Sequence, residues 1–503
     1  MDRREFLRRS AAVALVGIGV ESALAANRPS SRALRELARD LRGPVVTPGA
    51  AGYAAGRLLY NPRFDGFHPR AIAYAASTED VERAIHWARK HEFRLTPRSG
   101  GHSYGGYSTS EGIVLDVTRL RRVRAQGGTA SIDAGALLID AYSSLAASGV
   151  TIPAGTCPSV GIAGLALGGG HGYAARKLGL TCDAIESLTI VTANGHRLVC
   201  SGRQHADLFW ACRGGGGGNF GVVTGFRFRT TPVQDVSYYS IQWPWRDAAA
   251  AFDAWQRFAP HAPDELSSTL FLAATKTATA TPAITSGGQF FGSASQLQTL
   301  IAPLAAAGDP IRVQVGTLGY LDAVKRWAGC ASDTIAECHV AGKSPHGILP
   351  RLTFKGASQY ADAPLPAEGI GRILTALETR QADPRLGRAE VILDAYGGAI
   401  SRVGKEATAF VHRDALCSIQ YVAIWKQSDP ASVVRANLRW IESLTAAVRP
   451  FVSGFSYQNY IDPSLGDWQQ AYYGSNLARL VSIKRKYDPS NFFRFRQSIP
   501  TRL

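Results

Sequence analysis

The apolar and polar positions of the chain follow two different patterns. Up to about residue 235, short apolar runs of the strand type alternate with amphipathic helical segments and with dense clusters of glycine. From about Val236 onward the glycine density falls, and alternating strand-like segments mix with helical ones. Because such a change of pattern marks a change of packing, we place a domain boundary there.

Helical and strand periodicities predict the individual elements. The first pattern begins with a helix over residues 31–41, a strand over residues 71–75, and a helix over residues 81–91 that residues 77–80 cap. A short strand over residues 93–96 then leads into a glycine-rich loop. Further strands are predicted over residues 112–116, 129–134, 185–192, 197–200, 222–229, 270–274 and 283–288, and further helices over residues 137–147, 248–258 and 293–306.

Composition indicates an ordinary globular protein with a basic surface. The chain has 503 residues, of which 46% are hydrophobic and 19% charged, which suits two or three domains. The net charge of +16 suggests an anionic partner, yet the arginines are scattered among acidic residues. Neither zinc-finger spacing nor a basic-aromatic RNA motif occurs, so we expect no nucleic-acid partner.

The first 26 residues have the features of a targeting segment. Arg3 and Arg4 precede a bulky apolar pair, an apolar run covers residues 11–20, and small residues at 23–25 supply a cleavage site. The run is too short to span a bilayer. The pattern resembles a bacterial twin-arginine (Tat) signal, which predicts export of the folded protein by the Tat machinery to the periplasm or the extracellular space. No later segment has 18 unbroken apolar residues, so we expect no stable membrane span in the mature protein.

The seven cysteines are an odd number, which in an exported protein leaves at least one thiol outside any disulfide. No pair has C-x-x-C spacing, so we expect no metal site of the zinc or iron–sulfur type. Cys330 and Cys338 are near enough in sequence for a local disulfide, and reduced buried thiols are the alternative.

Two glycine clusters carry the strongest chemical signal. Residues 96–108 surround His102 with four glycines, and residues 155–172 contain Cys157 near their start. Glycine lets the backbone turn sharply and bring its N–H groups close to an anion such as a phosphate. Either side chain alone would indicate a loop histidine or a buried cysteine. Together they are two nucleophiles placed where a planar ring can approach the backbone, as a flavin dinucleotide requires.

A nicotinamide cofactor fits the sequence less well. Gly170-x-Gly172-x-x-Ala175 matches a loose dinucleotide-binding pattern, but glycines precede it where a strand is needed. The nearest acidic residue, Glu186, also follows too closely to contact a ribose.

These motifs resemble those of the berberine bridge enzyme-like family of FAD-linked oxidases, in the vanillyl-alcohol-oxidase/PCMH flavoprotein group. Residues 98–104 resemble the family loop whose histidine carries FAD through the 8α methyl, and residues 155–161 the motif whose cysteine bonds flavin C6. Residues 488–500 are similar to the family's closing signature. The resemblance spans nearly the whole mature chain and implies bicovalent FAD, held through His102 and Cys157.

The resemblance also implies the fold class, which is α+β. A PCMH-type FAD-binding domain of two subdomains is expected over residues 27–235, with its core at about 64–232. A substrate-binding domain over residues 236–464 is expected to be an antiparallel sheet covered by helices, and residues 465–503 to complete the FAD domain.

Two catalytic residues are implied by the same resemblance. Tyr460 lies in a Y-x-N-Y-x-D segment whose second tyrosine is the family's base, which removes the substrate hydroxyl proton. A tyrosine is a poor base at neutral pH unless its anion is stabilised or its proton is relayed. Asp394 falls where sugar-oxidising relatives keep an aspartate that pairs with this tyrosine. The alternatives are a core aromatic for Tyr460 and a turn former at a strand end for Asp394.

The remaining cofactor contacts are assigned by position in the motifs. Val160 matches a position described in the family as an oxygen gate, where a small valine accompanies reactivity with O2. The other implied FAD contacts are Arg98, Ser99, Gly100, Gly101, Ser103, Tyr104, Gly161, Gly164, Gly168, Gly169, Gly172, Val223 and Asn476. His171 stands where relatives usually have an uncharged residue, and its orientation stays open.

The expected function is that of a secreted FAD-dependent oxidase with a small-molecule substrate and O2. Hydride leaves an alcohol or hemiacetal carbon, with an oligosaccharide as the favoured substrate, and O2 is reduced to H2O2. The alternatives are tailoring of a secondary metabolite on the same scaffold and a flavin-binding protein without turnover.

Overall fold

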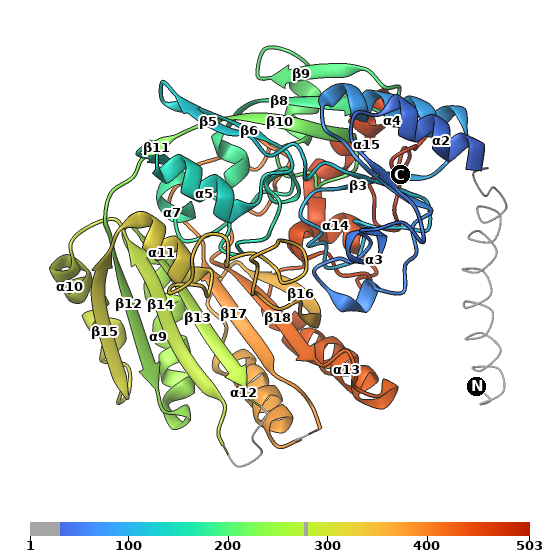
Figure 1. The fold of residues 1–503 in the computed structure, drawn as a ribbon. Coiled ribbons are helices and arrows are strands. Elements are labelled where there is room, and N and C mark those ends of the chain that lie inside the picture. The colour runs from blue at the N-terminus through green and yellow to red at the C-terminus, as the bar shows by residue number, and fades with distance from the viewer. Residues whose placement is uncertain (1–30, 276–279, 384) are drawn as a thin grey trace.

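A computed structural model of the chain describes residues 31–275, 280–383 and 385–503 (Figure 1). The predicted signal segment, residues 1–26, lies outside the described residues. The described chain contains both helices and sheets, and the predicted α+β class is confirmed.

The N-terminal part contains a four-stranded sheet with the order β1-β2-β4-β3. Its strands are β1 (Val45–Val46), β2 (Ala71–Tyr74), β4 (Ile113–Asp116) and β3 (Leu95–Arg98). Both β2 and β3 pair with β4 in parallel, so β4 lies between the strands of the predicted strand–helix–strand unit. The connecting helix α4 (Thr78–Lys90) begins three residues before its predicted start, because Ser77 caps it by accepting a hydrogen bond from the backbone of Asp80.

A five-stranded antiparallel sheet with the order β5-β6-β10-β8-β9 lies beside it. Its strands are β5 (Val123–Gln126), β6 (Thr129–Asp133), β10 (Gly221–Arg229), β8 (Ile185–Thr192) and β9 (Arg197–Ser201). A two-stranded pair, β7 (Val150–Thr151) and β11 (Thr231–Pro232), accompanies it. The helices of these two parts are α2 (Ser31–Asp40), α3 (Tyr53–Gly56), α5 (Leu138–Ala146), α6 (Ile162–Leu167), α7 (Ala175–Leu178) and α8 (Ala206–Ala211).

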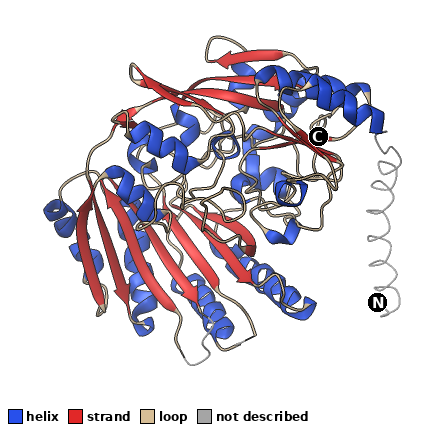
Figure 2. Cartoon of the chain, viewed as in Figure 1, coloured by secondary structure: helices blue, strands red, loops and turns tan. Residues whose placement is uncertain are grey.

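The second half of the chain forms one seven-stranded antiparallel sheet, ordered β15-β12-β14-β13-β17-β18-β16. Its strands are β15 (Arg312–Leu318), β12 (Val236–Trp243), β14 (Ala283–Phe290), β13 (Leu266–Ala274), β17 (Ala389–Ala395), β18 (Cys417–Trp425) and β16 (Thr353–Ala361). Figure 2 shows helices along one face of this sheet. They are α9 (Ala248–Phe258), α10 (Ala294–Ala305), α12 (Ala367–Gln381) and α13 (Ala431–Val448).

Side chains on the sheet alternate between a helix-packed face and a face that lines a cavity. Leu270, Leu393 and Ile419 belong to the core shared with the helices. Their neighbours Thr269 and Asp394, which pair across β13 and β17, line the cavity instead. This is the two-residue repeat of a strand, and it gives the sheet one apolar face and one face for binding.

The C-terminal segment runs back to the first part of the chain, as the red elements in Figure 1 show. Helix α15 (Leu477–Tyr487) contacts α8 and follows α14 (Trp468–Tyr473). Lys484 of α15 is fully buried, where its Nζ donates to Asp488 and to the carbonyl oxygens of Asn219 and Phe493. These bonds tie the chain end to the segment just before β10.

Some predicted boundaries need correction. Strand β3 begins at Leu95 and ends at Arg98, so it runs two residues further into the glycine loop than residues 93–96. Strand β5 was not predicted, because its half-exposed VRAQ sequence has no strong apolar alternation. The local disulfide between Cys330 and Cys338 is present.

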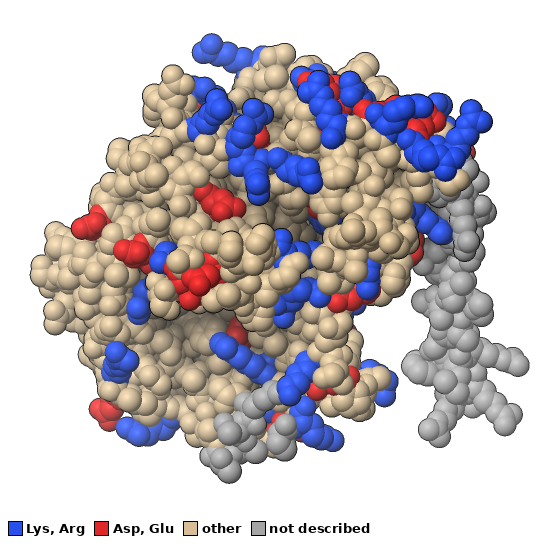
Figure 3. Space-filling view, viewed as in Figure 1, with Lys and Arg blue, Asp and Glu red and all other residues tan. Residues whose placement is uncertain are grey.

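The distribution of charged side chains on the surface agrees with the mixture of basic and acidic residues along the sequence. Figure 3 shows Lys and Arg side chains spread over the visible face and mixed with Asp and Glu. Within the described residues, no helix combines the length and the apolar character that crossing a membrane requires.

Candidate active site

One large cavity lies where the glycine loops face the inner side of the seven-stranded sheet. Its volume is about 920 Å³. The glycine loops supply residues 98–104 and parts of 155–165 to its wall, and the sheet supplies Thr269, Asp394 and Gln420. The cavity is large enough for an extended cofactor together with part of a substrate.

The two glycine loops touch because both have glycine at the point of contact. A Cβ atom on Gly100 would lie 2.3 Å from the backbone nitrogen of Gly161, and a Cβ atom on Gly161 would lie 2.1 Å from Ser99 Oγ. No side chain fits at either position. The close approach brings His102 and Cys157 to the wall of the same cavity.

His102 is fixed by a hydrogen bond and a ring contact. Its Nε2 lies 2.9 Å from Ser159 Oγ, and its ring stacks on Tyr60 at 4.0 Å between centroids. Burial lowers the pKa of His102 to about 3, so the imidazole is neutral at ordinary pH. Because Ser159 engages Nε2, Nδ1 is the ring nitrogen available for a bond to a cofactor.

Cys157 is the thiol that faces the cavity. It is an exposed free cysteine, whereas the other free cysteines of the described chain are buried, namely Cys182, Cys200, Cys212 and Cys417. Desolvation in the cavity wall raises the pKa of the Cys157 thiol, so it is protonated at neutral pH. The odd thiol expected from the cysteine count is therefore the one beside the loop of His102.

A third glycine segment completes this part of the wall. Gly216, Gly217 and Gly218 line the cavity, and Gly216 and Gly218 have φ values of +87° and +74°. A Cβ atom on Gly164, opposite Gly217, would meet nothing within 4 Å. Backbone N–H groups of such glycine runs can surround a phosphate, so these residues fit the FAD that the sequence predicts. The run of five glycines is visible in the sequence, but no motif there assigns it a role.

Tyr460 and Asp394 face the cavity with His171 between them. Tyr460 ends the short helix η6 (Gln458–Tyr460), and Asp394 is the penultimate residue of β17. Tyr460 Oη lies 3.2 Å from His171 Nε2, and His171 Nδ1 lies 4.0 Å from Asp394 Oδ2. A direct pair of Tyr460 and Asp394 was expected. In the described chain no hydrogen bond joins the two, because the imidazole lies between them.

The surroundings of Tyr460 keep its phenol protonated. Burial raises the pKa of Tyr460 well above its ordinary value, and nearby Tyr104 and Asp394 raise it further. The Tyr460 ring stacks on Tyr104 with 5.2 Å between centroids. Tyr104 Oη in turn accepts a hydrogen bond of 2.7 Å from Gln420.

Most residues assigned from the sequence line this cavity. They are Arg98, Ser99, Gly100, Gly101, His102, Ser103, Tyr104, Cys157, Val160, Gly161, Gly164, Gly172, Val223, Asp394 and Tyr460. The guanidinium of Arg98 is engaged elsewhere, since its Nε donates to Asp116 at 2.6 Å and its Nη2 to the carbonyl oxygen of Gly56 at 2.7 Å. Arg98 therefore holds the start of the loop in place.

Gly168 and Gly169, expected as cofactor contacts, are not among the residues that line the cavity. A Cβ atom on Gly168 would lie 2.0 Å from Asn459 Oδ1, and one on Gly169 would lie 2.8 Å from the ring of Phe410. These glycines instead let the loop pack closely against the residues behind it.

Asn476 does not line the cavity either. Its side-chain amide donates to the backbone carbonyl oxygens of Lys405, Thr408 and Ala409. Asn476 therefore anchors the segment before β18, and its contact with a cofactor stays a prediction.

Nothing in the sequence indicated one group of residues in the cavity wall. Tyr173 lines this wall together with Trp327, which is the last residue of α11 (Tyr320–Trp327). The two rings stack on each other at 4.0 Å between centroids. Arg326 and Phe271 lie on the same wall. No local motif reveals this group, because its members come from segments far apart in the chain.

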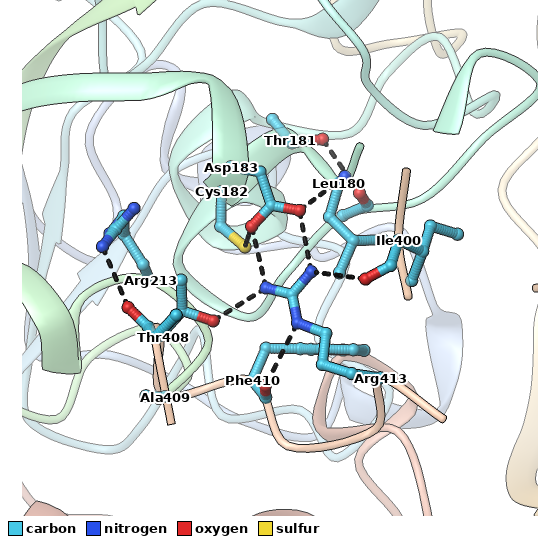
Figure 4. A network of polar contacts seen from close by, with 12 residues as sticks. Leu180, Thr181, Cys182, Asp183, Arg213, Ile400, Thr408, Ala409, Phe410 and Arg413 are labelled. Atoms are coloured by element: carbon cyan, nitrogen blue, oxygen red, sulfur yellow. Dashed lines mark hydrogen bonds and ion pairs between the residues drawn. The ribbon is translucent and has the colours of Figure 1, made fainter. Parts of the chain in front are cut away.

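A buried ion pair fixes the segment between β17 and β18 against residues 180–183, which follow the second glycine cluster (Figure 4). Arg413 donates through Nη1 and Nη2 to the two carboxylate oxygens of Asp183, at 2.8 and 2.7 Å, and both side chains are buried. Arg413 Nη2 also donates to Thr408 Oγ1 at 2.7 Å. The residues next to Asp183 hold the loop of His171, since Thr181 and Cys182 donate backbone hydrogen bonds to the carbonyl oxygens just before it.

Two protein families match the chain. The FAD binding domain family matches residues 69–201, and the berberine and berberine-like family matches residues 456–500. The uncharacterized FAD-linked oxidoreductase YgaK of Bacillus subtilis is 34% identical, over 92% of this chain and 97% of its own length. Monolignol oxidoreductase AtBBE-like 13 of Arabidopsis thaliana is 30% identical, over 84% and 82%.

Solved structures share the whole fold. Physcomitrella patens BBE-like 1 superposes with a TM-score of 0.84 at 31% identity, and a chitooligosaccharide oxidase with 0.83 at 28%. The xylooligosaccharide oxidase of Myceliophthora thermophila C1, solved with xylobiose, gives 0.82 at 26%. Each comparison covers 93% of this chain and 99% of the other. The PCMH-type architecture is confirmed, and the chain belongs to the berberine bridge enzyme-like family of FAD-linked oxidoreductases.

Proposed function

We propose that this oxidoreductase is an exported oxidase for an alcohol or hemiacetal carbon of an oligosaccharide-type substrate. The substrate C–H and O–H bonds are replaced by a C=O bond, and O2 is reduced to H2O2. The observation that carries the proposal is the placement of the Tyr460 hydroxyl in the same cavity as His102 and Cys157.

His102 and Cys157 would hold FAD by two covalent bonds. The neutral His102 ring presents Nδ1, and Cys157 presents the exposed free thiol of the cavity wall. Bound FAD supplies the hydride acceptor for the oxidation. The glycine backbones around Gly100, Gly164 and Gly217 would receive its phosphates and ring.

Tyr460 would take the hydroxyl proton of the substrate. A base in this role has to lie within hydrogen-bond reach of the substrate and of the acceptor for its own proton. Tyr460 faces the cavity, where a substrate would lie, and its hydroxyl is 3.2 Å from His171, which can accept its proton.

An oligosaccharide is supported by two kinds of observation. The family members of similar fold include oxidases named for chitooligosaccharides and xylooligosaccharides. The cavity is also lined by the stacked pair Tyr173 and Trp327 and by polar Gln420 and Glu390, a mixture of flat apolar and hydrogen-bonding surface that suits a sugar ring. The relative named as a monolignol oxidoreductase favours the alternative, tailoring of an aromatic metabolite on the same scaffold.

Export through the Tat machinery is part of the proposal. The twin arginines, the short apolar run and the small-residue cleavage site support it. Export of the folded protein would carry the covalently loaded cofactor with it.

Aerobic incubation with a substrate panel tests the proposed activity. The purified protein is mixed with chitooligosaccharides, xylooligosaccharides and cinnamyl-type alcohols, and peroxide is measured. We expect peroxide with a sugar, and a loss of at least about a hundredfold in Tyr460→Phe. Tyr487→Phe, which removes a hydroxyl bonded to Asp207 outside the cavity, is the matched control. Peroxide from the aromatic alcohols alone would favour tailoring, and no turnover of any compound would favour a flavin-binding protein.

A further inference from the structure

His171 lies between the two residues that the sequence assigns to catalysis. It comes from the end of the second glycine cluster and lines the cavity. The titratable groups that face it are Asp394 and Tyr396 at the end of β17, and Tyr457 and Tyr460 around η6. A catalytic role for His171 rests on the proposed function, because it concerns the proton that the substrate hydroxyl loses.

Tyr460 needs an acceptor for its own proton. Its phenol is protonated at neutral pH because burial raises its pKa, so it can take a proton from a substrate only while it gives one away. Asp394 is engaged by Thr269, whose Oγ1 donates to Asp394 Oδ1 at 2.8 Å. The basic atom within hydrogen-bond distance of Tyr460 Oη among the described residues is His171 Nε2, at 3.2 Å.

The neighbouring tyrosines have other partners. Tyr457 Oη accepts hydrogen bonds from the backbone of Gly170 and from Asn459, each at 2.8 Å. Tyr396 Oη is 3.1 Å from Tyr360 Oη. Of the three tyrosines whose rings surround His171, Tyr460 is therefore the one whose hydroxyl meets the imidazole.

The geometry also selects the tautomer of the imidazole. For Tyr460 to donate to Nε2, the proton of the neutral ring has to be on Nδ1, which faces Asp394 Oδ2 at 4.0 Å. A carboxylate on that side orients the ring and stabilises the imidazolium that forms when Nε2 takes a second proton.

We infer that His171 is the proton acceptor behind Tyr460, and that Asp394 acts on the reaction through His171. As the hydride leaves the substrate carbon, the substrate hydroxyl proton passes to Tyr460 Oη and the Tyr460 proton passes to His171 Nε2. Bound FAD would supply the hydride acceptor and the substrate would become a carbonyl compound, so electrons and protons balance. His171 is a positioning and relay residue, since it meets the substrate only through Tyr460.

The tautomer tests this relay without any substrate. The holoenzyme is prepared with ¹⁵N-labelled histidine, and the His171 ring signals are identified by their loss in His171→Gln. We expect the ring proton on Nδ1, with Nε2 free to accept from Tyr460. A proton on Nε2 would overturn the proposal, because that tautomer cannot accept from Tyr460.

The reductive step tests the relay during turnover. Anaerobic flavin reduction by the substrate found in the panel should be at least about a hundredfold slower in His171→Gln. Gln can keep the hydrogen bond to Tyr460 but cannot take up a proton, and the amount of protein-bound flavin after acid denaturation should stay at the wild-type level.

Imidazole rescue separates a relay from a structural role. Added imidazole should restore reduction in His171→Ala and leave the wild type unaffected. An unchanged rate of flavin reduction in His171→Gln, or no rescue of His171→Ala at normal flavin content, would overturn the relay. If no compound reduces the wild-type flavin, the proposed function fails, while the tautomer measurement still decides the relay.

Discussion

Cys157 and His102 enter the same cavity wall from loops 55 residues apart in sequence, and each is poised differently for a bond to FAD. The His102 ring is neutral with Nε2 engaged by Ser159. The Cys157 thiol faces the cavity but is protonated, since desolvation raises its pKa. In the proposed attachment, the neutral His102 ring can therefore form its bond to FAD as it stands, whereas the Cys157 thiol first has to lose its proton.

Cys157→Ala should still bind FAD covalently, through His102. We expect the acid-denatured protein to remain yellow, with one flavin per chain by absorbance, and His102→Ala/Cys157→Ala to release all of its flavin. A colourless denatured Cys157→Ala protein would show that His102 has been misassigned.

Val160→Leu tests whether residue 160 controls access of O2. Val160 lines the cavity three residues after Cys157, so the longer leucine side chain would extend into the space that O2 has to cross. We expect reoxidation of the reduced flavin by O2 to slow by about tenfold or more. Stopped-flow reduction without O2 should stay near the wild-type rate, as should both rates in Val160→Ala. An equal loss of reduction and reoxidation would contradict a gating role.

Among single residues, the sequence identifies side chains that lie in motifs. It misses roles that depend on a contact with a residue far away in the chain. His102, Cys157 and Tyr460 are recognisable because their neighbours in the chain are diagnostic. Ser159 and His171 lie in the same motifs, yet their roles depend on which ring nitrogen meets which hydroxyl. Such a contact between residues 171 and 460 has no signal in either segment. For the same reason, the sequence around Asn476 does not show that its amide donates to backbone carbonyl oxygens.

Among the elements, the segment between β17 and β18 does most to hold the two halves of the cavity together. Arg413 of this segment is fully buried against Asp183, which follows the loop of His171. A buried charge without its partner is strongly unfavourable, so this pair fixes the segment's position.

Asp183→Asn should destabilise the protein by about 3–5 kcal/mol, because it leaves the Arg413 guanidinium buried without a counter-charge. Urea unfolding followed by circular dichroism measures this loss. Glu368→Gln, which breaks the exposed pair with Arg372, should cost less than about 1 kcal/mol. Equal effects of the two variants would contradict the structural role of the buried pair.

The same segment makes stability depend on pH through His412. Burial lowers the pKa of His412 to about 3, and its ring stacks on Tyr360 at 4.3 Å. The unfolded chain takes up a proton at His412 below about pH 6.5, whereas the folded chain does so only near pH 3. The contribution of His412 to the free energy of unfolding is therefore present above pH 6.5 and is lost as the pH falls toward 3.

His412→Phe should flatten this dependence. We expect the free energy of unfolding to fall less between pH 7 and pH 4.5 in His412→Phe than in the wild type, measured by urea unfolding at each pH. His68→Gln, at an exposed histidine, should retain the wild-type slope. A wild-type slope in His412→Phe would contradict the role of His412 in the pH dependence of stability.

Element prediction from the sequence succeeded where periodicity is strong. Strand β8 and helix α9 match their predicted bounds, because both carry a full apolar repeat. The order of the strands within each sheet could not be predicted, because pairing such as that of β13 with β17 is set by packing between distant segments.

For the molecule as a whole, the active site exists only where the two halves meet. The glycine loops supply the cofactor wall, and the alternation of the seven-stranded sheet supplies Thr269, Asp394 and Gln420 to the other wall. The fold class and the cofactor were predictable from motifs, whereas the shape of the substrate wall was not, because Tyr173 and Trp327 meet only in the folded chain. The central claim is that one FAD is bonded to both glycine loops.

Peptide mapping of the purified wild-type protein tests that claim most directly. Trypsin should release residues 99–119, which contain His102, and residues 125–176, which contain Cys157. We predict that the two peptides are recovered as a single species joined by one FAD, with flavin absorbance and the summed mass. Two unmodified peptides, with free FAD in the acid supernatant, would contradict bicovalent attachment.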